Sequence, residues 1–224
     1  MSLAEQPIFN MMPRWDNGWG VQFEHEVEDS SGERMHLLHV EGVYTWQRWI
    51  RLTYKVPWLL SESALGNPVL ALPLKKYFNN DGRSGSFSLT PEVSLPLSEV
   101  TLKLAGLSLG YSQETYRTTV DVSLAAHLQR KGLTFTRAVD ELPLEWQLNF
   151  AAGGKYYPFD SVGNLRLSAD FRYRPGGDYA LRAGPVAYWR INDRWHVQAS
   201  WKRTLAAQGF DSGNWIRSGL AVVF

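Results

Sequence analysis

The feature that most constrains this chain is a two-residue alternation of apolar and polar side chains that recurs along almost its whole length. Between residues 165 and 174 every odd position is apolar, from Leu165 to Tyr173, and every even position is polar, from Arg166 to Arg174. Successive side chains of a β-strand point to opposite faces, so this period indicates strands with one apolar and one polar face. The pattern recurs over residues 179–191, 195–202 and 216–224. The chain is therefore predicted to be all-β.

The same pattern sets the number of strands. Eight further segments alternate near residues 18–28, 35–46, 49–60, 68–77, 86–97, 106–116, 118–129 and 144–157. They bring the predicted count to twelve, and each segment is long enough for the roughly 9 to 11 residues with which a tilted strand crosses a bilayer. Ten strands is the alternative count, because the links at 78–85 and 159–163 are longer than short turns should be.

Alternation alone does not say which face meets solvent, so a soluble sandwich or a lipocalin-like barrel is an alternative. Two observations favour a membrane. The apolar faces carry more large side chains than a small barrel could enclose, and aromatic residues such as Trp46, Trp58, Tyr156 and Trp195 gather near strand ends, as in interfacial girdles. The mean hydropathy of −0.28 agrees with this, because half of every strand would face a polar lumen. We predict a transmembrane antiparallel up-and-down β-barrel in the bacterial outer membrane.

The links between segments alternate in length. Tight links are predicted at 47–48, 117 and 192–193, and longer polar links at 29–33, 61–67, 129–143 and 205–214. Outer-membrane barrels have short periplasmic turns and longer extracellular loops, so the first set is assigned to the periplasmic side. Residues 18–224 are predicted to form the single barrel domain, and residues 1–17, which lack alternation, are predicted to form either a leader or a partial plug.

The last residues, with Phe224, Val222 and Leu220 on one face, resemble the terminal signal of bacterial outer-membrane proteins, which the barrel-assembly machinery reads. Ser218 departs from that pattern. No secretory signal is visible at the start of the chain. We interpret Met1, Ser2 and Leu3 as residues added ahead of a mature start near Ala4, which is a hypothesis.

Composition removes several classes of function. The 23 Lys and Arg residues nearly balance the 22 Asp and Glu residues, which argues against a nucleic-acid-binding protein. The absence of cysteine removes disulfides, thiolate metal sites and cysteine nucleophiles. His36, His39, His127 and His196 are scattered without metal-ligand spacing. We therefore predict no metal, cofactor or catalytic residues.

Residues 51–58 (RLTYKVPW), the stretch 70–97 and residues 213–217 (GNWIR) resemble a family of outer-membrane channels assigned to the MetA pathway of phenol degradation. The resemblance lies in the general character of the sequence over most of the chain and includes no diagnostic motif. It implies a monomeric twelve-stranded channel of narrow bore and does not identify its substrate. It supplies no functional residues. The predicted barrel itself is expected to contact outer-membrane lipid and lipopolysaccharide and to take a small molecule as its permeant.

With the polar faces turned inward, charged side chains would line the pore. The candidate pore-lining residues are Glu24, Glu26, Glu41, Arg166, Asp170, Arg172, Arg174, Arg182, Arg190, Lys202 and Arg217. Barrel closure sets the first strand beside the last, so an acidic strip would border a basic ladder. These charges would either form ion pairs or leave a transverse field in the pore, and both interpretations stay open. The inward arginines predict a channel for small anionic or aromatic solutes.

Two rival functions remain. A lipid hydrolase needs a serine, a histidine and an orienting polar group on the lipid-facing side. His25 and Ser218 are predicted to face outward at comparable heights on adjoining strands, but the sequence shows no third outward polar partner. A non-conducting scaffold or adhesion barrel is the other alternative. The primary prediction is a channel and not an enzyme.

Overall fold

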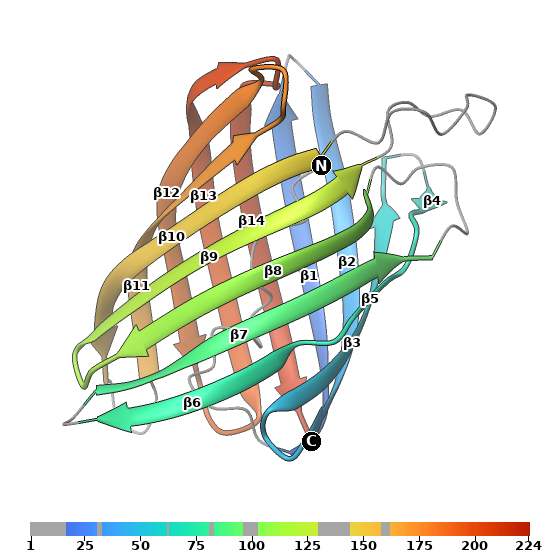
Figure 1. Cartoon of the computed structure of the whole chain (residues 1–224). Helices are drawn as coiled ribbons and strands as arrows, with labels where there is room; N and C mark the ends of the chain where they lie inside the picture. The colour runs from blue at the N-terminus through green and yellow to red at the C-terminus, as the bar shows by residue number, and fades with distance from the viewer. Residues whose placement is uncertain are drawn as a thin grey trace.

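The computed structural model describes residues 17–30, 33–61, 63–80, 83–95, 103–129, 144–157 and 162–224. The proposed leader or plug therefore lies, except for Asn17, outside the described residues. Within the described residues no helix is long and apolar enough to cross a membrane. Figure 1 shows the strands, which are β1 (Gly18–Ser30), β2 (Glu33–Trp46), β3 (Ile50–Leu59), β4 (Ala64–Leu65), β5 (Val69–Ala71), β6 (Leu74–Asn80), β7 (Arg83–Ser94), β8 (Lys103–Glu114), β9 (Thr118–Gln129), β10 (Leu144–Tyr156), β11 (Val162–Tyr173), β12 (Tyr179–Arg190), β13 (Trp195–Gln208) and β14 (Gly213–Val223).

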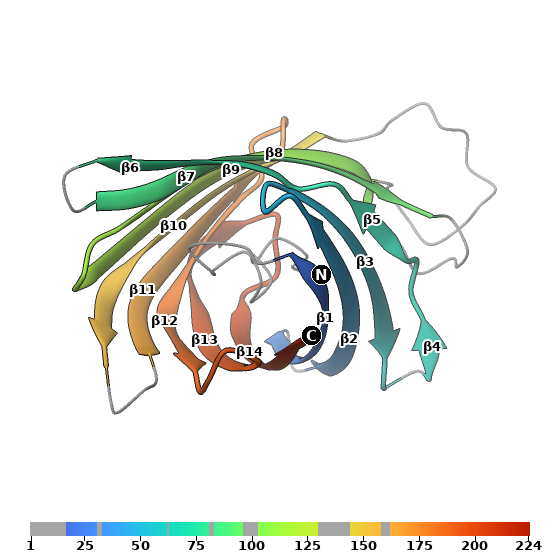
Figure 2. The same ribbon diagram turned by 90° about the horizontal axis from the view of Figure 1, so that it is seen from below.

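The strands close into a single antiparallel barrel (Figure 2). β1 pairs with β14 from Gly20 opposite Val223 to Ser30 opposite Gly213, and β2 pairs with both β1 and β3. β5 and β6 together occupy one position between β3 and β7, and β4 is a two-residue extension beside β3. The described strands thus fill twelve positions around the barrel. The twelve-strand prediction is confirmed, and the ten-strand alternative is wrong.

One predicted strand, at 68–77, is interrupted. β5 ends at Ala71 and β6 begins at Leu74, because Pro73 has no backbone N–H to donate to a neighbouring strand. The surrounding backbone remains paired across the gap. The N–H of Arg51 donates to the carbonyl of Pro73 at 2.9 Å, and the N–H of Leu72 donates to the carbonyl of Pro91 at 3.0 Å. The barrel wall therefore continues through the break.

The two rims of the barrel differ. Tight turns at 47–49, 115–117 and 191–194 lie at one rim, which we call the turn rim, and the opposite end is the loop rim. At the first turn Gln47 and Arg48 adopt left-handed backbone angles, with φ of 52° and 63°. These turns match the predicted tight links.

Several predicted links are shorter in the structure. β1 runs to Ser30 and β2 begins at Glu33, so the predicted longer link at 29–33 shrinks to two residues. β13 extends to Gln208, which shortens the predicted link at 205–214, and β6 and β7 leave only 81–82 of the link at 78–85. The strands pair beyond the last apolar residue of each segment, where the side chains no longer alternate. The sequence therefore underestimates the length of these strands and overestimates the links. Most of the predicted link at 129–143 lies outside the described residues.

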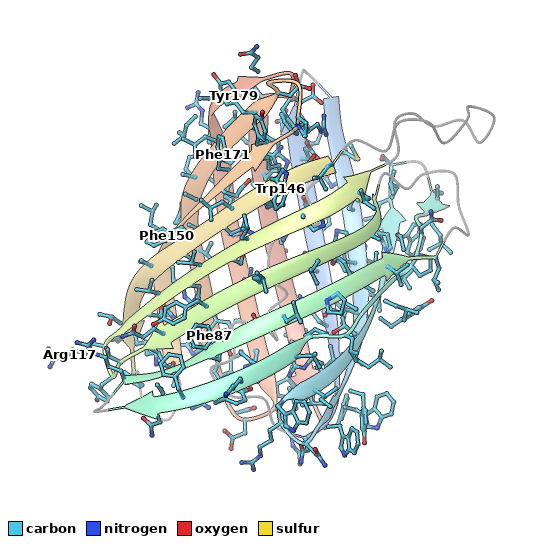
Figure 3. The ribbon with its side chains drawn as sticks, in the orientation of Figure 1. Phe87, Arg117, Trp146, Phe150, Phe171 and Tyr179 are labelled. Atoms are coloured by element: carbon cyan, nitrogen blue, oxygen red, sulfur yellow. The ribbon has the colours of Figure 1, made fainter. Side chains whose placement is uncertain are left out.

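The barrel is apolar outside and polar inside. Phe87, Trp146, Phe150, Phe171 and Tyr179 project away from the wall in Figure 3. On β11 the outward Leu167 is 65% exposed, whereas the neighbouring inward Arg166 is 5% exposed. This is the reverse of a soluble barrel and is the arrangement that a lipid bilayer requires. The predicted orientation of the two faces is confirmed.

Candidate functional site

The closing seam between β1 and β14 holds a buried cluster of charged side chains. Arg217 is paired in register with Glu26, and its Nη2 lies 2.7 Å from Glu26 Oε2 while its Nε lies 3.1 Å from Glu24 Oε1. Gln22 Nε2 donates to Glu24 Oε2 at 3.1 Å, and Lys55 Nζ lies 4.0 Å from Glu24 Oε1. Of the two interpretations left open by the sequence, ion pairing is the one seen at this seam.

The same cluster brings a histidine to two carboxylates. One ligand atom each from Glu24, Glu26 and His39 lies within 4.8 Å of the others, so three potential metal ligands that are far apart in sequence meet in the barrel. In the sequence His39 is one of four scattered histidines, but in the structure it lies beside two carboxylates, which corrects that interpretation. Both carboxylates already bind the guanidinium of Arg217, whose positive charge opposes a metal ion at this point. We therefore describe the cluster as an ion-pair network.

A second cluster lies on β11, β12 and β13, around Asp170. Lys202 Nζ lies 3.2 Å from Asp170 Oδ1, and Arg172 Nε lies 3.8 Å from Asp170 Oδ2. Arg182 is opposite Asp170 in register, and its guanidinium carbon stacks 3.6 Å from the ring centroid of the buried Trp215. A small cavity, about large enough for one water molecule, is lined by Glu26, Asp170, Arg182, Ser200, Lys202, Trp215 and Arg217.

Positive charge in this second cluster is incompletely neutralised. No carboxylate of the described residues lies within ion-pair distance of Arg182, which is 4% exposed. Arg182 Nε, Arg172 Nε and Arg172 Nη2 are buried without a hydrogen-bond partner in the described part of the chain. Buried donors normally have partners, and a buried cation normally has a counter-charge. Three cationic side chains therefore surround Asp170, and two of them, Arg172 and Arg182, keep donors that no hydrogen bond in the described residues satisfies.

Other inward cations are paired with carboxylates that the sequence analysis did not single out. Arg166 bonds to Asp121, Lys155 Nζ lies 2.5 Å from Glu114 Oε2, and Arg174 Nη2 lies 3.1 Å from Glu145 Oε2. Each missed residue lies on the same face as the other charged side chains of its strand. The two-residue alternation was therefore sufficient to predict that it points inward. The buried Glu28, Arg51 and Lys75 were also missed.

The structure places every candidate pore-lining residue on the inner face of the barrel. Arg174 and Arg190, near opposite rims, are half-buried. The buried members are Glu24, Glu26, Glu41, Arg166, Asp170, Arg172, Arg182, Lys202 and Arg217. Their part in permeation stays a prediction. Phe224, Val222 and Leu220 lie at the end of β14 on its outer face, and their role as an assembly signal also stays a prediction.

Solved structures with the same architecture are outer-membrane channels. The chain superposes on the COG4313 outer membrane channel from Pseudomonas putida F1 with a TM-score of 0.59 at 14% identity, covering 94% of this chain and 97% of that one. The fold is that of an outer-membrane porin. The KdgM porin gives a TM-score of 0.57 at 11% identity, covering 92% and 99%, and the NanC porin gives 0.56 at 9%, covering 92% and 100%. No protein-family model and no curated protein sequence matches the chain.

An outer-membrane location follows from the architecture. A closed antiparallel barrel with an apolar exterior satisfies its backbone hydrogen bonds internally and presents to lipid only side chains that lipid tolerates. The porin fold and this exterior assign the chain to the bacterial outer membrane. The expected relation to the family of the MetA pathway has no matching family model and stays a prediction.

Proposed function

We propose that the chain is an outer-membrane channel that passes small anionic solutes through a narrow lumen lined by arginine and glutamate side chains. The observation that carries this proposal is the cluster around Asp170, where one carboxylate faces Arg172, Arg182 and Lys202. Twelve strands give a barrel between the filled interior of eight strands and the aqueous pore of sixteen. Inward side chains therefore decide both the bore and the charge of the path.

The open donors of Arg172 and Arg182 would act as a weak anion site within the lumen. The charges of Arg172 and Arg182 would attract a permeant carboxylate that passes the cluster, because three of their buried N–H groups have no hydrogen-bond partner in the described residues. Because Asp170 already shares its charge between Lys202 and Arg172, it attracts the permeant's counter-cation only weakly. Conduction requires a site that binds well enough to admit the ion and weakly enough to release it.

The test is osmotic swelling of vesicles that contain the full-length protein, with three solutes of similar size that carry a carboxylate, no charge or an ammonium group. We expect the carboxylate to enter fastest. Substituting Arg182→Gln and Arg172→Gln together should lower the carboxylate rate at least about tenfold relative to the neutral solute, since each guanidinium supplies a charge-assisted hydrogen bond.

The control is Arg117→Gln, which makes the same kind of substitution once, in an exposed turn that points away from the barrel in Figure 3. This variant should swell like the unmodified protein. Faster entry of the ammonium solute, or an unchanged preference in the double variant, would refute an anion-selective lumen. Equal swelling with and without the protein would refute the channel itself.

A further inference from the structure

The lipid-facing surface of β13, β14, β1 and β2 contains one compact polar exception. His25, His36 and Ser218 are the polar side chains at outward positions within its apolar band, and all three are adjacent in the sheet. The other outward residues of these strands in that band are Trp19, Val21, Phe23, Val27, Leu38, Val40, Gly42, Tyr44, Trp46, Trp195, Val197, Ala199, Trp201, Ile216, Leu220 and Val222. Polar groups facing lipid are expensive and rare, so three neighbouring exceptions indicate a function.

Register places the three residues side by side with His25 in the middle, and the two histidine side chains are in contact. His25 is directly opposite Ser218 across the closing seam, where the Cα atoms of such pairs are about 4.5 to 5.5 Å apart. His36 lies on β2 opposite Val27, one outward position further along β1. His25 Nε2 lies within hydrogen-bonding distance of His36 Nδ1, at 3.3 Å, and the two rings stack with centroids 5.5 Å apart.

This order is that of a nucleophile, a base and an orienting group. A serine hydroxyl becomes nucleophilic when a neighbouring imidazole accepts its proton, and a third polar group holds that imidazole in position. The Ser218 hydroxyl has no hydrogen-bond partner in the described residues and is exposed on the lipid side. His36 supplies the third partner that the sequence analysis did not find.

The depth of the cluster suits the ester group of a lipid. On β2, Arg34 lies two residues from His36 towards the loop rim and pairs with Asp29 at 3.3 Å. Arg203 is the corresponding cation on β13 and is opposite Asn214. By register, Arg34 and Arg203 both lie four residues from the level of Ser218, which in a tilted strand is about 10 Å along the membrane normal. A lipid phosphate held by the side chain of Arg34 or Arg203 would therefore lie on the loop-rim side of Ser218, with its acyl esters extending towards the serine.

We propose that Ser218, His25 and His36 form a lipid-facing site that hydrolyses the acyl ester of a phosphate-bearing membrane lipid. Ser218 Oγ attacks the ester carbonyl while His25 takes its proton, the bond to the alcohol oxygen breaks, and His25 returns the proton to that oxygen. Water then attacks the acyl-serine, gives a proton to His25, and the fatty acid leaves as the serine hydroxyl is restored. His36 is the positioning residue.

The test uses the full-length barrel refolded into vesicles of glycerophospholipid and, in a separate arm, into vesicles that contain lipid A. Released fatty acid is measured in each arm, which distinguishes the two sources of the ester. We expect Ser218→Ala to lose at least about 100-fold of the rate, in line with the contribution of a nucleophile and its base. A serine-directed phosphonate should label Ser218 and should not label this variant.

The matched control is Ser168→Ala, an inward serine on β11, which should keep the full rate. His36→Ala should lower the rate about tenfold and shift its pH profile, and His36→Gln should restore part of the rate. Heat-modifiable gel mobility checks that each variant is folded. Absence of fatty-acid release in both arms, or an unchanged rate in Ser218→Ala, would overturn the proposal. Vesicle swelling in the same samples reports the channel separately, because Ser218 lies outside the lumen.

Discussion

At the scale of single residues, ion pairs organise the charged interior, and several of the charged groups have more than one partner of opposite charge. Arg217 binds two carboxylates, whereas Asp170 is shared by cations. Alternation of the sequence was sufficient to place these side chains on the inner face, because parity alone decides it. It could not predict their partners, since the partner of Arg217 depends on the register between the first and last strands. The Asp121 and Glu145 pairs were missed for the same reason.

The Arg217 pair predicts a large and rescuable loss of stability. Arg217→Met should lower the free energy of unfolding by about 3 to 5 kcal/mol, because it leaves Glu24 and Glu26 buried without their principal counter-charge. Adding Glu24→Gln and Glu26→Gln should recover most of this loss. Urea titration in phospholipid vesicles, followed by tryptophan fluorescence, measures all three proteins. A loss below about 1 kcal/mol in Arg217→Met would contradict the assignment.

At the scale of elements, strand register decides where side chains meet. The two-residue link between β1 and β2 places His36 beside His25. The sequence predicts a longer link there, because the apolar alternation stops at Asp29 and the polar residues that follow it. A longer link would leave the register between the two strands undefined, and with it the positions of His25 and His36 relative to each other. The sequence shows where the apolar alternation ends, but the backbone pairing of the two strands continues beyond that point. The register of the hairpin could therefore not be predicted from the sequence.

Another element-scale feature is the close approach of β12 and β13. The pairing shifts register between Leu181 and Arg182, and a Cβ added at Gly184 would overlap the backbone oxygen of Trp201. Only glycine lets the two backbones come this close. The approach lies next to Lys202, so it helps to hold that side chain against Asp170.

This packing predicts that Gly184→Ala destabilises the barrel by about 1 to 3 kcal/mol, as overpacking usually does. Gly42→Ala on β2 is the matched control, because a Cβ there meets no atom within 4 Å, and its effect should stay within about 0.5 kcal/mol. The midpoint of urea unfolding in vesicles measures both. Equal midpoints for the two variants would show that the strands do not need the close approach.

At the scale of the whole molecule, closure turns a nearly neutral composition into a charged interior. The 23 basic and 22 acidic residues say little as totals. Once β1 lies beside β14, carboxylates from the first strands neutralise Arg217, while the cations around Arg182 keep part of their charge. The exterior of the same strands is apolar, so the low mean hydropathy is a consequence of the barrel.

The barrel is expected to enclose an open and anion-preferring path, and single-channel recording of the full-length protein in a planar bilayer tests this most directly. With a salt gradient across the bilayer, we expect stepwise conductance and a reversal potential displaced towards that of chloride. A bilayer that contains the folded protein and shows no steps, or a reversal potential displaced towards that of the cation, would contradict an open, anion-preferring path.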